Sequence, residues 1–146
     1  MRVGVFLSLA VGLFLAANLA KGDASQDDMK KMEGTWAMVS GEQDGKKLPE
    51  ETVKSASLTI KGNKHTVKIG DETIVGTHKV DASKKPKAID ATDTEGPFKG
   101  KTTLGIYEVD DDMFKVCFAG PDKERPKEFT IQSGTGTLNH VWKRKK

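Results

Sequence analysis

Two short turns in the middle of the chain constrain its fold more than any other feature of the sequence. Gly62-Asn63 and Gly70-Asp71 are residue pairs of the type that closes a two-residue β-hairpin with glycine in the first position. When strands are paired outward from both turns, residues 57–80 divide into one apolar and one polar face. A shift of one residue at either turn would mix lysines into the apolar face. The turns therefore predict a three-stranded antiparallel meander.

The apolar face of this meander carries two histidines among six aliphatic residues. Its members are Leu58, Ile60, His65, Val67, Ile69, Ile74, His78 and Val80. The turns place His65 and His78 on neighbouring strands with an offset of two residues, so we expect the two residues to lie within roughly 7–8 Å of each other.

Extended segments of similar length stand on both sides of the meander. The expected strands are residues 35–43, 88–92, 101–109, 114–118, 128–132 and 137–144. Their regular spacing, without a long helical period, predicts an all-β fold: an antiparallel up-and-down β-barrel of about eight strands. Residues 25–32 and 46–55 are expected to form short helical turns at the barrel ends.

The hairpin around Asp110-Asp111-Asp112 allows two registers. A two-residue loop would set Tyr107 opposite Phe114, whereas a three-residue loop puts Leu104 and Ile106 on the face of Phe114. We expect the three-residue loop, because it collects the apolar residues on one face of the sheet.

The first 24 residues have the pattern of a secretory signal peptide. A positive start at Arg2 precedes the mostly apolar run 3–17, and small residues follow at Ala20 and Ala24. The run is shorter than the roughly 20 residues that a membrane-spanning helix needs. We therefore expect cleavage after Ala20 or Ala24, a barrel domain of residues 25–146, no remaining transmembrane segment, and a secreted or periplasmic protein.

The charge pattern and the cysteine content argue against nucleic-acid binding and against an internal disulfide. The 24 basic and 21 acidic residues alternate along the chain, without the basic face and stacking aromatics that nucleic-acid binding needs. We expect a monomer that binds no nucleic acid. The basic run 143–146 is interpreted as a solvated tail, with weak attraction to an anionic surface as the alternative. Cys117, the only cysteine, is interpreted as a small packed residue.

The opening Gly34-x-Trp36 resembles the first motif of lipocalins. In that family the tryptophan closes one barrel end and a basic residue at the end of the last strand stacks on it, a role that the resemblance gives to Arg144. The chain is shorter than ordinary lipocalins and lacks their paired cysteines. The resemblance implies a barrel with an interior that can hold a ligand.

A closer similarity, to the secreted lipocalin-like domain family abundant in planctomycete bacteria, extends over nearly all of the chain after the leader. That family has no established biochemical function. The motifs that carry the similarity are Gly34-Thr35-Trp36, Asp44-Gly45-Lys46, Lys85-Pro86-Lys87-Ala88-Ile89-Asp90, Thr94-Glu95-Gly96-Pro97, Gly100-Lys101, Gly105-Ile106-Tyr107-Glu108, Cys117-Phe118 and Glu124-Arg125-Pro126-Lys127-Glu128-Phe129.

We expect non-enzymatic binding of a small apolar or amphipathic molecule inside the barrel, as the resemblance to lipocalins implies. Nucleophile and zinc-protease motifs are absent from the sequence. No cofactor is expected. The alternative is a dry-cored barrel that acts through its surface as an interaction or accessory protein of the cell envelope; its interior phenylalanines would be Phe114, Phe118 and Phe129. The residues expected to contact a ligand are Leu58, Ile60, His65, Val67, Ile74, His78, Leu104, Ile106, Phe114, Val116 and Phe118.

Two metal hypotheses are weaker. His65, His78 and His140 all fall on apolar faces, and three inward imidazoles could hold Zn²⁺ with an open fourth position. Asp93 and Glu95 lie in a segment with some likeness to a calcium loop, but the alternating oxygen ligands and the closing glutamate are missing. We interpret the segment from Asp93 to Pro97 as a solvated turn.

Overall fold

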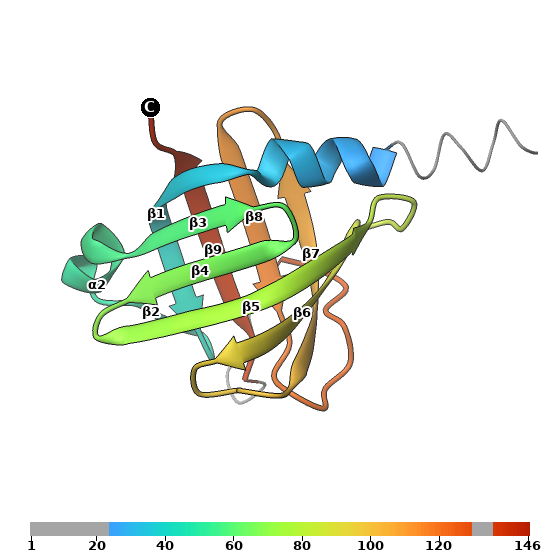
Figure 1. Ribbon diagram of the computed structural model, residues 1–146. Coiled ribbons are helices and arrows are strands. Elements are labelled where there is room, and N and C mark those ends of the chain that lie inside the picture. The colour runs from blue at the N-terminus through green and yellow to red at the C-terminus, as the bar shows by residue number, and fades with distance from the viewer. Residues whose placement is uncertain (1–23, 130–135) are drawn as a thin grey trace, which may run out of the picture.

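The computed structural model describes residues 24–129 and 136–146. Apart from Ala24, the expected signal peptide lies outside the described residues. A helix over residues 24–32 precedes the elements labelled in Figure 1. These are β1 (Gly34–Gln43), β2 (Lys46–Lys47), α2 (Glu50–Ser55), β3 (Ser57–Lys61), β4 (Lys64–Ile69), β5 (Glu72–Asp81), β6 (Ala88–Glu95), β7 (Thr102–Val109), β8 (Met113–Phe118) and β9 (Leu138–Arg144).

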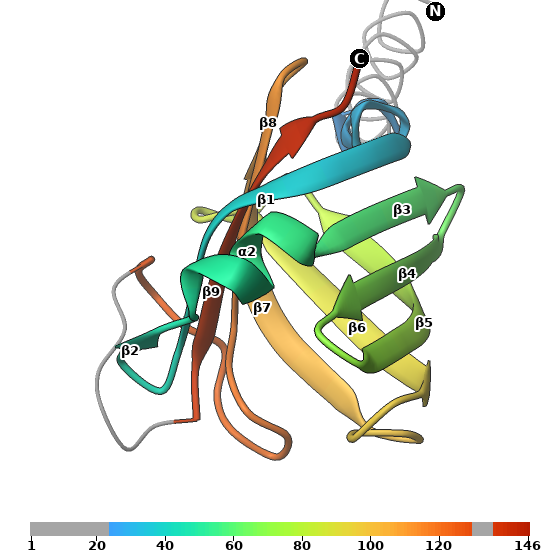
Figure 2. The ribbon, with the colours of Figure 1, turned by 90° about the vertical axis from the view of Figure 1, so that its left-hand side faces the viewer.

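The strands form one antiparallel sheet that closes on itself. Eight strands follow one another in chain order from β1 through β3 to β9, and β9 pairs back with β1, while the short β2 extends the other side of β1. Figures 1 and 2 show the sheet wrapped around a common interior. Because each strand pairs with its neighbour in sequence, the fold is the up-and-down β-barrel that the strand spacing predicted.

The meander has the register that its turns predicted. Ile60 pairs with His65 across β3 and β4, and Val67 pairs with Ile74 across β4 and β5. Gly62 and Gly70 both have φ of 60°, whereas the residue after each glycine is not among the described residues with positive φ. This is the type II′ geometry, in which glycine occupies the first central position.

The β7–β8 hairpin differs from our expectation. Tyr107 pairs with Val116 and Ile106 pairs with Cys117, so Leu104 and Ile106 lie on the outer face instead of beside Phe114. The backbone N–H of Asp110 donates to the Met113 carbonyl at 2.9 Å, which closes a two-residue tip of Asp111 and Asp112. Neither expected register is found, because Val109 and not Tyr107 lies opposite Phe114. The expectation was wrong because it assumed that only the inner face of this sheet is covered.

The segment of residues 119–129 covers the outside of β6, β7 and β8. The Arg125 guanidinium donates to the carbonyl oxygens of Ile89 and Gly105 at 3.0 and 2.8 Å, and to the Asp90 carboxylate at 2.6 Å. Residues that face outward are therefore buried; they are Ala88, Ile106 and Cys117.

The strand expected at residues 128–132 is wrong where the structure describes it, because Glu128 and Phe129 lie in a bend. Residues 130–132 lie outside the described residues. Phe129 is not inward as expected: its ring lies outside the barrel, 4.3 Å from the Lys115 ammonium. This position of the ring is explained by the outward-facing apolar residues of the sheet, which would otherwise be exposed to solvent.

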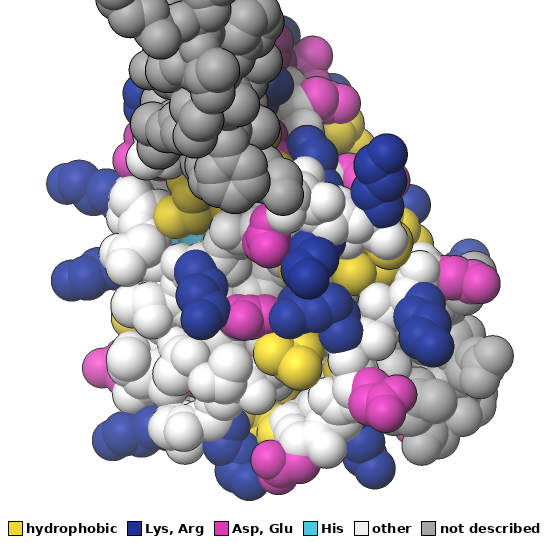
Figure 3. Space-filling view, turned by 90° about the vertical axis from the view of Figure 1, so that its right-hand side faces the viewer, with side chains coloured by type: hydrophobic (Ala, Val, Ile, Leu, Met, Phe, Trp, Pro, Cys, Tyr) yellow, Lys and Arg dark blue, Asp and Glu magenta, His cyan; other side chains and the backbone are white. Residues whose placement is uncertain are grey.

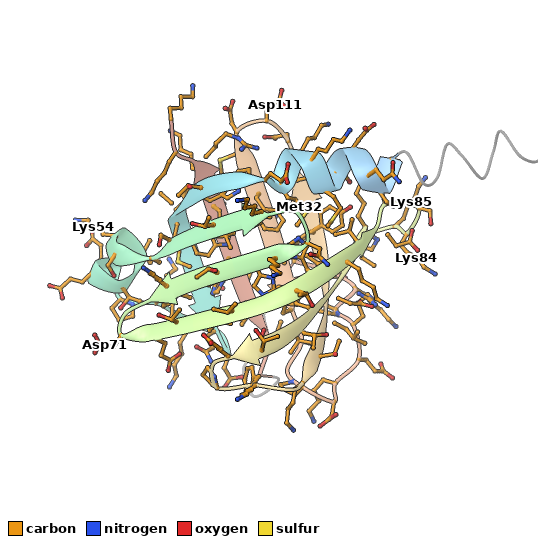
Figure 4. The ribbon with its side chains drawn as sticks, in the orientation of Figure 1. Met32, Lys54, Asp71, Lys84, Lys85 and Asp111 are labelled. Carbon is orange, nitrogen blue, oxygen red and sulfur yellow. The ribbon has the colours of Figure 1, made fainter. Side chains whose placement is uncertain are left out.

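The N-terminal helix lies across one end of the barrel, as expected for residues 25–32 (Figures 1 and 4). Its last residue, Met32, is 0% exposed, and the Met32 carbonyl accepts from the Trp36 indole N–H at 2.9 Å. The buried Asp28 carboxylate accepts from the Tyr107 hydroxyl at 2.7 Å and from the Lys87 ammonium at 2.9 Å. These contacts attach the helix to strands β1 and β7.

At this same barrel end, Arg144 of the last strand contacts residues of the N-terminal part of the described chain. Its guanidinium carbon lies 4.2 Å from the centre of the Trp36 ring, which confirms the contact that the lipocalin resemblance implied. The guanidinium also donates to the carbonyl oxygens of Lys31, Glu33 and Asp111. Gly34 stands beneath it, because a side chain there would come within 2.7 Å of Arg144 Nη1.

We expect Trp36→Ala to lower the free energy of unfolding by about 3–5 kcal/mol, since a fully buried ring would leave a cavity. Arg144→Ala should cost less, about 1–3 kcal/mol, because it removes a stacked cation and its hydrogen bonds without opening the core. Lys143→Ala, at the exposed neighbouring position, is the control and should change stability by less than about 0.5 kcal/mol. Urea unfolding followed by tryptophan fluorescence measures all three, and equal losses for Lys143→Ala and Arg144→Ala would contradict the role given to Arg144.

Candidate functional site

The barrel interior contains a mainly apolar cavity of about 140 Å³. Nine of the eleven residues expected to contact a ligand line it; the exceptions are Leu104 and Ile106, which face outward. Met32 of the N-terminal helix also lines the cavity, and so does Phe98 of the β6–β7 loop. Figure 1 places this loop at the end of the barrel away from the helix. Phe98 is 38% exposed, so it is a part of the cavity wall that meets solvent.

Three polar side chains from adjacent strands meet in this wall. His65 of β4 and His78 of β5 have their Nδ1 atoms 3.0 Å apart, which confirms the proximity that the turns predicted. The ring centres are 5.2 Å apart. Asp93 of β6 lies on the other side of His65, with 3.9 Å between Asp93 Oδ1 and His65 Nε2. We call these three residues the Asp93–His65–His78 row.

Gly76 makes room for the His65 ring. It pairs with His65 across β4 and β5 and with Asp93 across β5 and β6, so its position faces the cavity between them. A Cβ atom there would lie 2.8 Å from His65 Nε2 and closer still to the Thr92 carbonyl oxygen. The absence of a side chain at this position therefore allows the His65 imidazole to lie over β5 and reach toward both partners.

Asp93 is the site residue that sequence reasoning missed. Its carboxylate was expected in a solvated turn, but β6 continues to Glu95 and Asp93 is 9% exposed. The Gly96-Pro97 pair suggested an early end to the strand, whereas the backbone turns only after Glu95. The alternation of Ile89, Ala91 and Asp93 is a period of two that could have placed this carboxylate on the inner face.

His140 does not join the other two histidines in a metal site. It lines the cavity from β9 and makes an edge contact with Trp142, with ring centres 5.7 Å apart. Among the described residues, no group of three or more His, Cys, Asp or Glu side chains is arranged to hold a metal ion. The zinc hypothesis for His65, His78 and His140 therefore has no geometric support.

Burial keeps two of the cavity histidines neutral. It lowers the pKa of His78 from 6.5 to about 4, with a further contribution from the nearby His65, and it lowers the pKa of His140 to about 4 as well. Both rings are therefore uncharged at neutral pH. Each neutral ring offers one hydrogen-bond donor and one acceptor, so this part of the wall is polar without being cationic.

The outer surface has a different character. Basic and acidic side chains are interspersed over the face shown in Figure 3. A groove of about 620 Å³ lies between the loop after β5 and strands β7 to β9, and its lining includes Lys84, Lys85, Lys87 and Lys115. Figure 4 shows Lys84 and Lys85 on this loop, close to the end of the barrel that the N-terminal helix covers.

Comparisons of the chain with protein-family models, curated proteins and solved structures give no match. The site is therefore interpreted from its own residues. Within residues 24–129 and 136–146, no helix has the length and apolar character needed to cross a bilayer.

The lowered pKa values of His78 and His140 predict acid sensitivity. Between about pH 4 and 6.5 the unfolded chain binds more protons than the folded protein. The contribution of these two groups to the free energy of unfolding is therefore fully present above pH 6.5 and is lost as the pH drops toward 4. Each group accounts for at most about 3 kcal/mol. We expect His140→Phe to flatten the pH dependence of the free energy of unfolding in this window. An unchanged slope in urea titrations at several pH values would contradict it.

Gly76→Ala should destabilise the barrel by about 1–3 kcal/mol, because the new methyl group must displace the His65 ring or the Thr92 carbonyl. Gly120→Ala is the matched control: Gly120 also lines the cavity, but a Cβ atom there meets its nearest neighbour at an ordinary 3.6 Å. Thermal unfolding of the two variants measures the difference. Equal melting temperatures would show that His65 does not depend on this gap.

Proposed function

We propose that this protein is an exported, non-enzymatic binding protein that takes one small, largely apolar molecule into its barrel. The observation that supports this most is the cavity itself, which is enclosed by aliphatic and aromatic side chains and has one polar row in its wall. Such a combination of apolar walls and a few convergent polar groups is typical of sites that bind small molecules.

The size of the cavity limits the ligand. Its volume of about 140 Å³ lies below the range of 300–1,000 Å³ usual for drug-sized ligands. An apolar cavity of about 150 Å³ in another protein accepts benzene. We therefore propose a ligand of roughly six to nine non-hydrogen atoms, on the scale of a single aromatic ring or two small fused rings.

Export and the lack of catalysis are parts of the same proposal. Export is supported by the leader pattern of residues 1–24, and the binding role by the resemblance to secreted lipocalin-like domains. The lack of catalysis is supported by the sequence, in which nucleophile and zinc-protease motifs are absent. The single cysteine faces outward.

Binding can be tested with simple aromatic probes. We expect benzene, phenol or indole to bind the full-length protein with a dissociation constant of about 1 mM or tighter. The measurement is the chemical-shift change of backbone amides on β4 to β8 in NMR titrations. Ala91→Leu places three additional carbon atoms in the cavity and should weaken binding at least tenfold.

The control for Ala91→Leu is Thr59→Leu. Thr59 is exposed on β3, on the outer face of the same barrel, so its replacement introduces the same leucine side chain without entering the cavity. It should leave probe binding unchanged. Loss of binding in both variants, or in neither, would contradict an interior site.

A second candidate function follows from the small volume of the cavity and the larger groove outside. In this candidate the interior is dry, and the protein acts as an envelope accessory protein whose groove receives an acidic segment of a partner against Lys84 and Lys85. The probe titration separates the two candidates. Absence of interior binding, together with lost partner capture in Lys84→Glu/Lys85→Glu, would favour the second.

A further inference from the structure

We infer that the ligand of the barrel carries a hydrogen-bond donor, an N–H or O–H group, and that His78 Nε2 accepts it. The inference rests on the proposed binding function and adds the chemical class of the ligand. It follows from the order of Asp93, His65 and His78 along the wall, and from the ring nitrogens of the two histidines that this order leads us to expect to be protonated.

The row ends on a polar atom without a partner. His78 is 5% exposed, and its Nδ1 faces His65 Nδ1 at 3.0 Å. Its Nε2 atom is buried and has no hydrogen-bond partner among the described residues. The ring lines the cavity and its Nδ1 is already engaged, so Nε2 is the nitrogen of His78 that is left without a hydrogen-bond donor. A buried nitrogen of this kind costs about 1–3 kcal/mol while it stays unpaired.

If both imidazoles are neutral, the contact between the two Nδ1 atoms permits two proton arrangements. A neutral imidazole carries one proton, so one Nδ1 must donate and the other must accept. If His78 donates, its Nε2 is a bare acceptor and His65 carries its own proton on Nε2. If His65 donates, the protons are reversed, and His78 presents an Nε2–H donor to the cavity.

Asp93 decides between these arrangements. Its carboxylate oxygen lies 3.9 Å from His65 Nε2, and both side chains are only 11% exposed. In the first arrangement the His65 Nε2–H bond faces the negative carboxylate, which is attractive. In the second, the Nε2 lone pair faces that charge across a poorly solvated gap, which is repulsive. The row therefore favours Nε2–H on His65, Nδ1–H on His78 and an acceptor at His78 Nε2.

The rest of the wall agrees with an acceptor. The titratable side chains among the described residues lining the cavity are His65, His78, Asp93 and His140. Burial lowers the pKa of His78 to about 4, so its Nε2 keeps a free lone pair at neutral pH. The neutral rings of His78 and His140 offer no positive charge to an anion, and neither does the Asp93 carboxylate. The cavity thus suits small aromatic alcohols and azoles with one N–H or O–H, and it disfavours carboxylates.

The first experiment reads the proton positions without any ligand. Long-range ¹H–¹⁵N correlation spectra of the full-length protein at pH 7 distinguish protonated from bare imidazole nitrogens. We expect a proton on His65 Nε2 and His78 Nδ1, and none on His78 Nε2. In Asp93→Leu the preference for this arrangement should disappear. A proton on His78 Nε2 in the wild-type protein would overturn the inference.

The second experiment compares ligands of matched shape. Indole and indene differ in the N–H group of indole, and phenol and fluorobenzene differ in the O–H group. We expect indole and phenol to bind at least tenfold more tightly than their partners, because a buried site built for a donor rejects the analogue that lacks it. Benzoate should bind more weakly than phenol.

Two variants locate the accepting atom. His78→Phe should abolish the preference for indole over indene, whereas His140→Phe, which removes a cavity imidazole outside the row, should retain that preference. If indene binds as tightly as indole to the wild-type protein, the ligand class is wrong while the proposed function stands. If no probe binds, the proposed function fails and this inference fails with it.

Discussion

The pairing of β9 with β1 is the constraint on which the rest of the molecule depends. An open eight-stranded sheet would leave the inward side chains of β4 to β6 facing solvent, whereas closure brings them opposite those of β8 and β9. Trp36 and Arg144 are cross-strand partners within this pairing. Their stacked side chains also contact the N-terminal helix, so barrel closure and the plugging of one barrel end rely on the same two residues.

The interior is less apolar than stability alone would favour. Leucine or valine at positions 65 and 78 would fill the same wall without the unpaired His78 nitrogen, and Gly76 leaves out a side chain that a well-packed strand would normally have. These three departures occur together at one place, on two paired strands. Local departures from good packing are expected where a protein has a function to perform, which is why this row carries our interpretation of the site.

Much of the fold was predictable from local signals. The register of β3 to β5 follows from two glycine turns, because one face is buried and a slip would reverse every side chain. The same turns were sufficient to bring His65 next to His78. The Trp36–Arg144 contact needed more than local signals, since the two residues are far apart in the sequence, in the first and last strands, and only a resemblance to a known barrel family suggested it.

The two main errors have different causes, which are the cover that a distant segment provides and a misleading local turn signal. Leu104 and Ile106 were placed inward because an apolar residue on an outer face is unexpected, and only the segment around Arg125 makes that face a second core. Asp93 was placed in solvent because Gly96-Pro97 is a strong local turn signal. No period or turn within β7 reports which residues far along the chain will cover it, so the outward positions of Leu104 and Ile106 could not be settled from sequence alone. The alternation of β6 was a local signal for Asp93 that the turn signal outweighed.

The outer cover has a consequence for the thiol of Cys117. A lone cysteine in an oxidising compartment can join two molecules through an intermolecular disulfide. Here the side chain is 0% exposed beneath the outer segment, and burial raises its pKa, so little reactive thiolate forms. The Arg125 hydrogen bonds that hold the segment in place therefore also keep the thiol from forming a disulfide with a second molecule. Any loosening of that segment would turn a packed core residue into a crosslinking site.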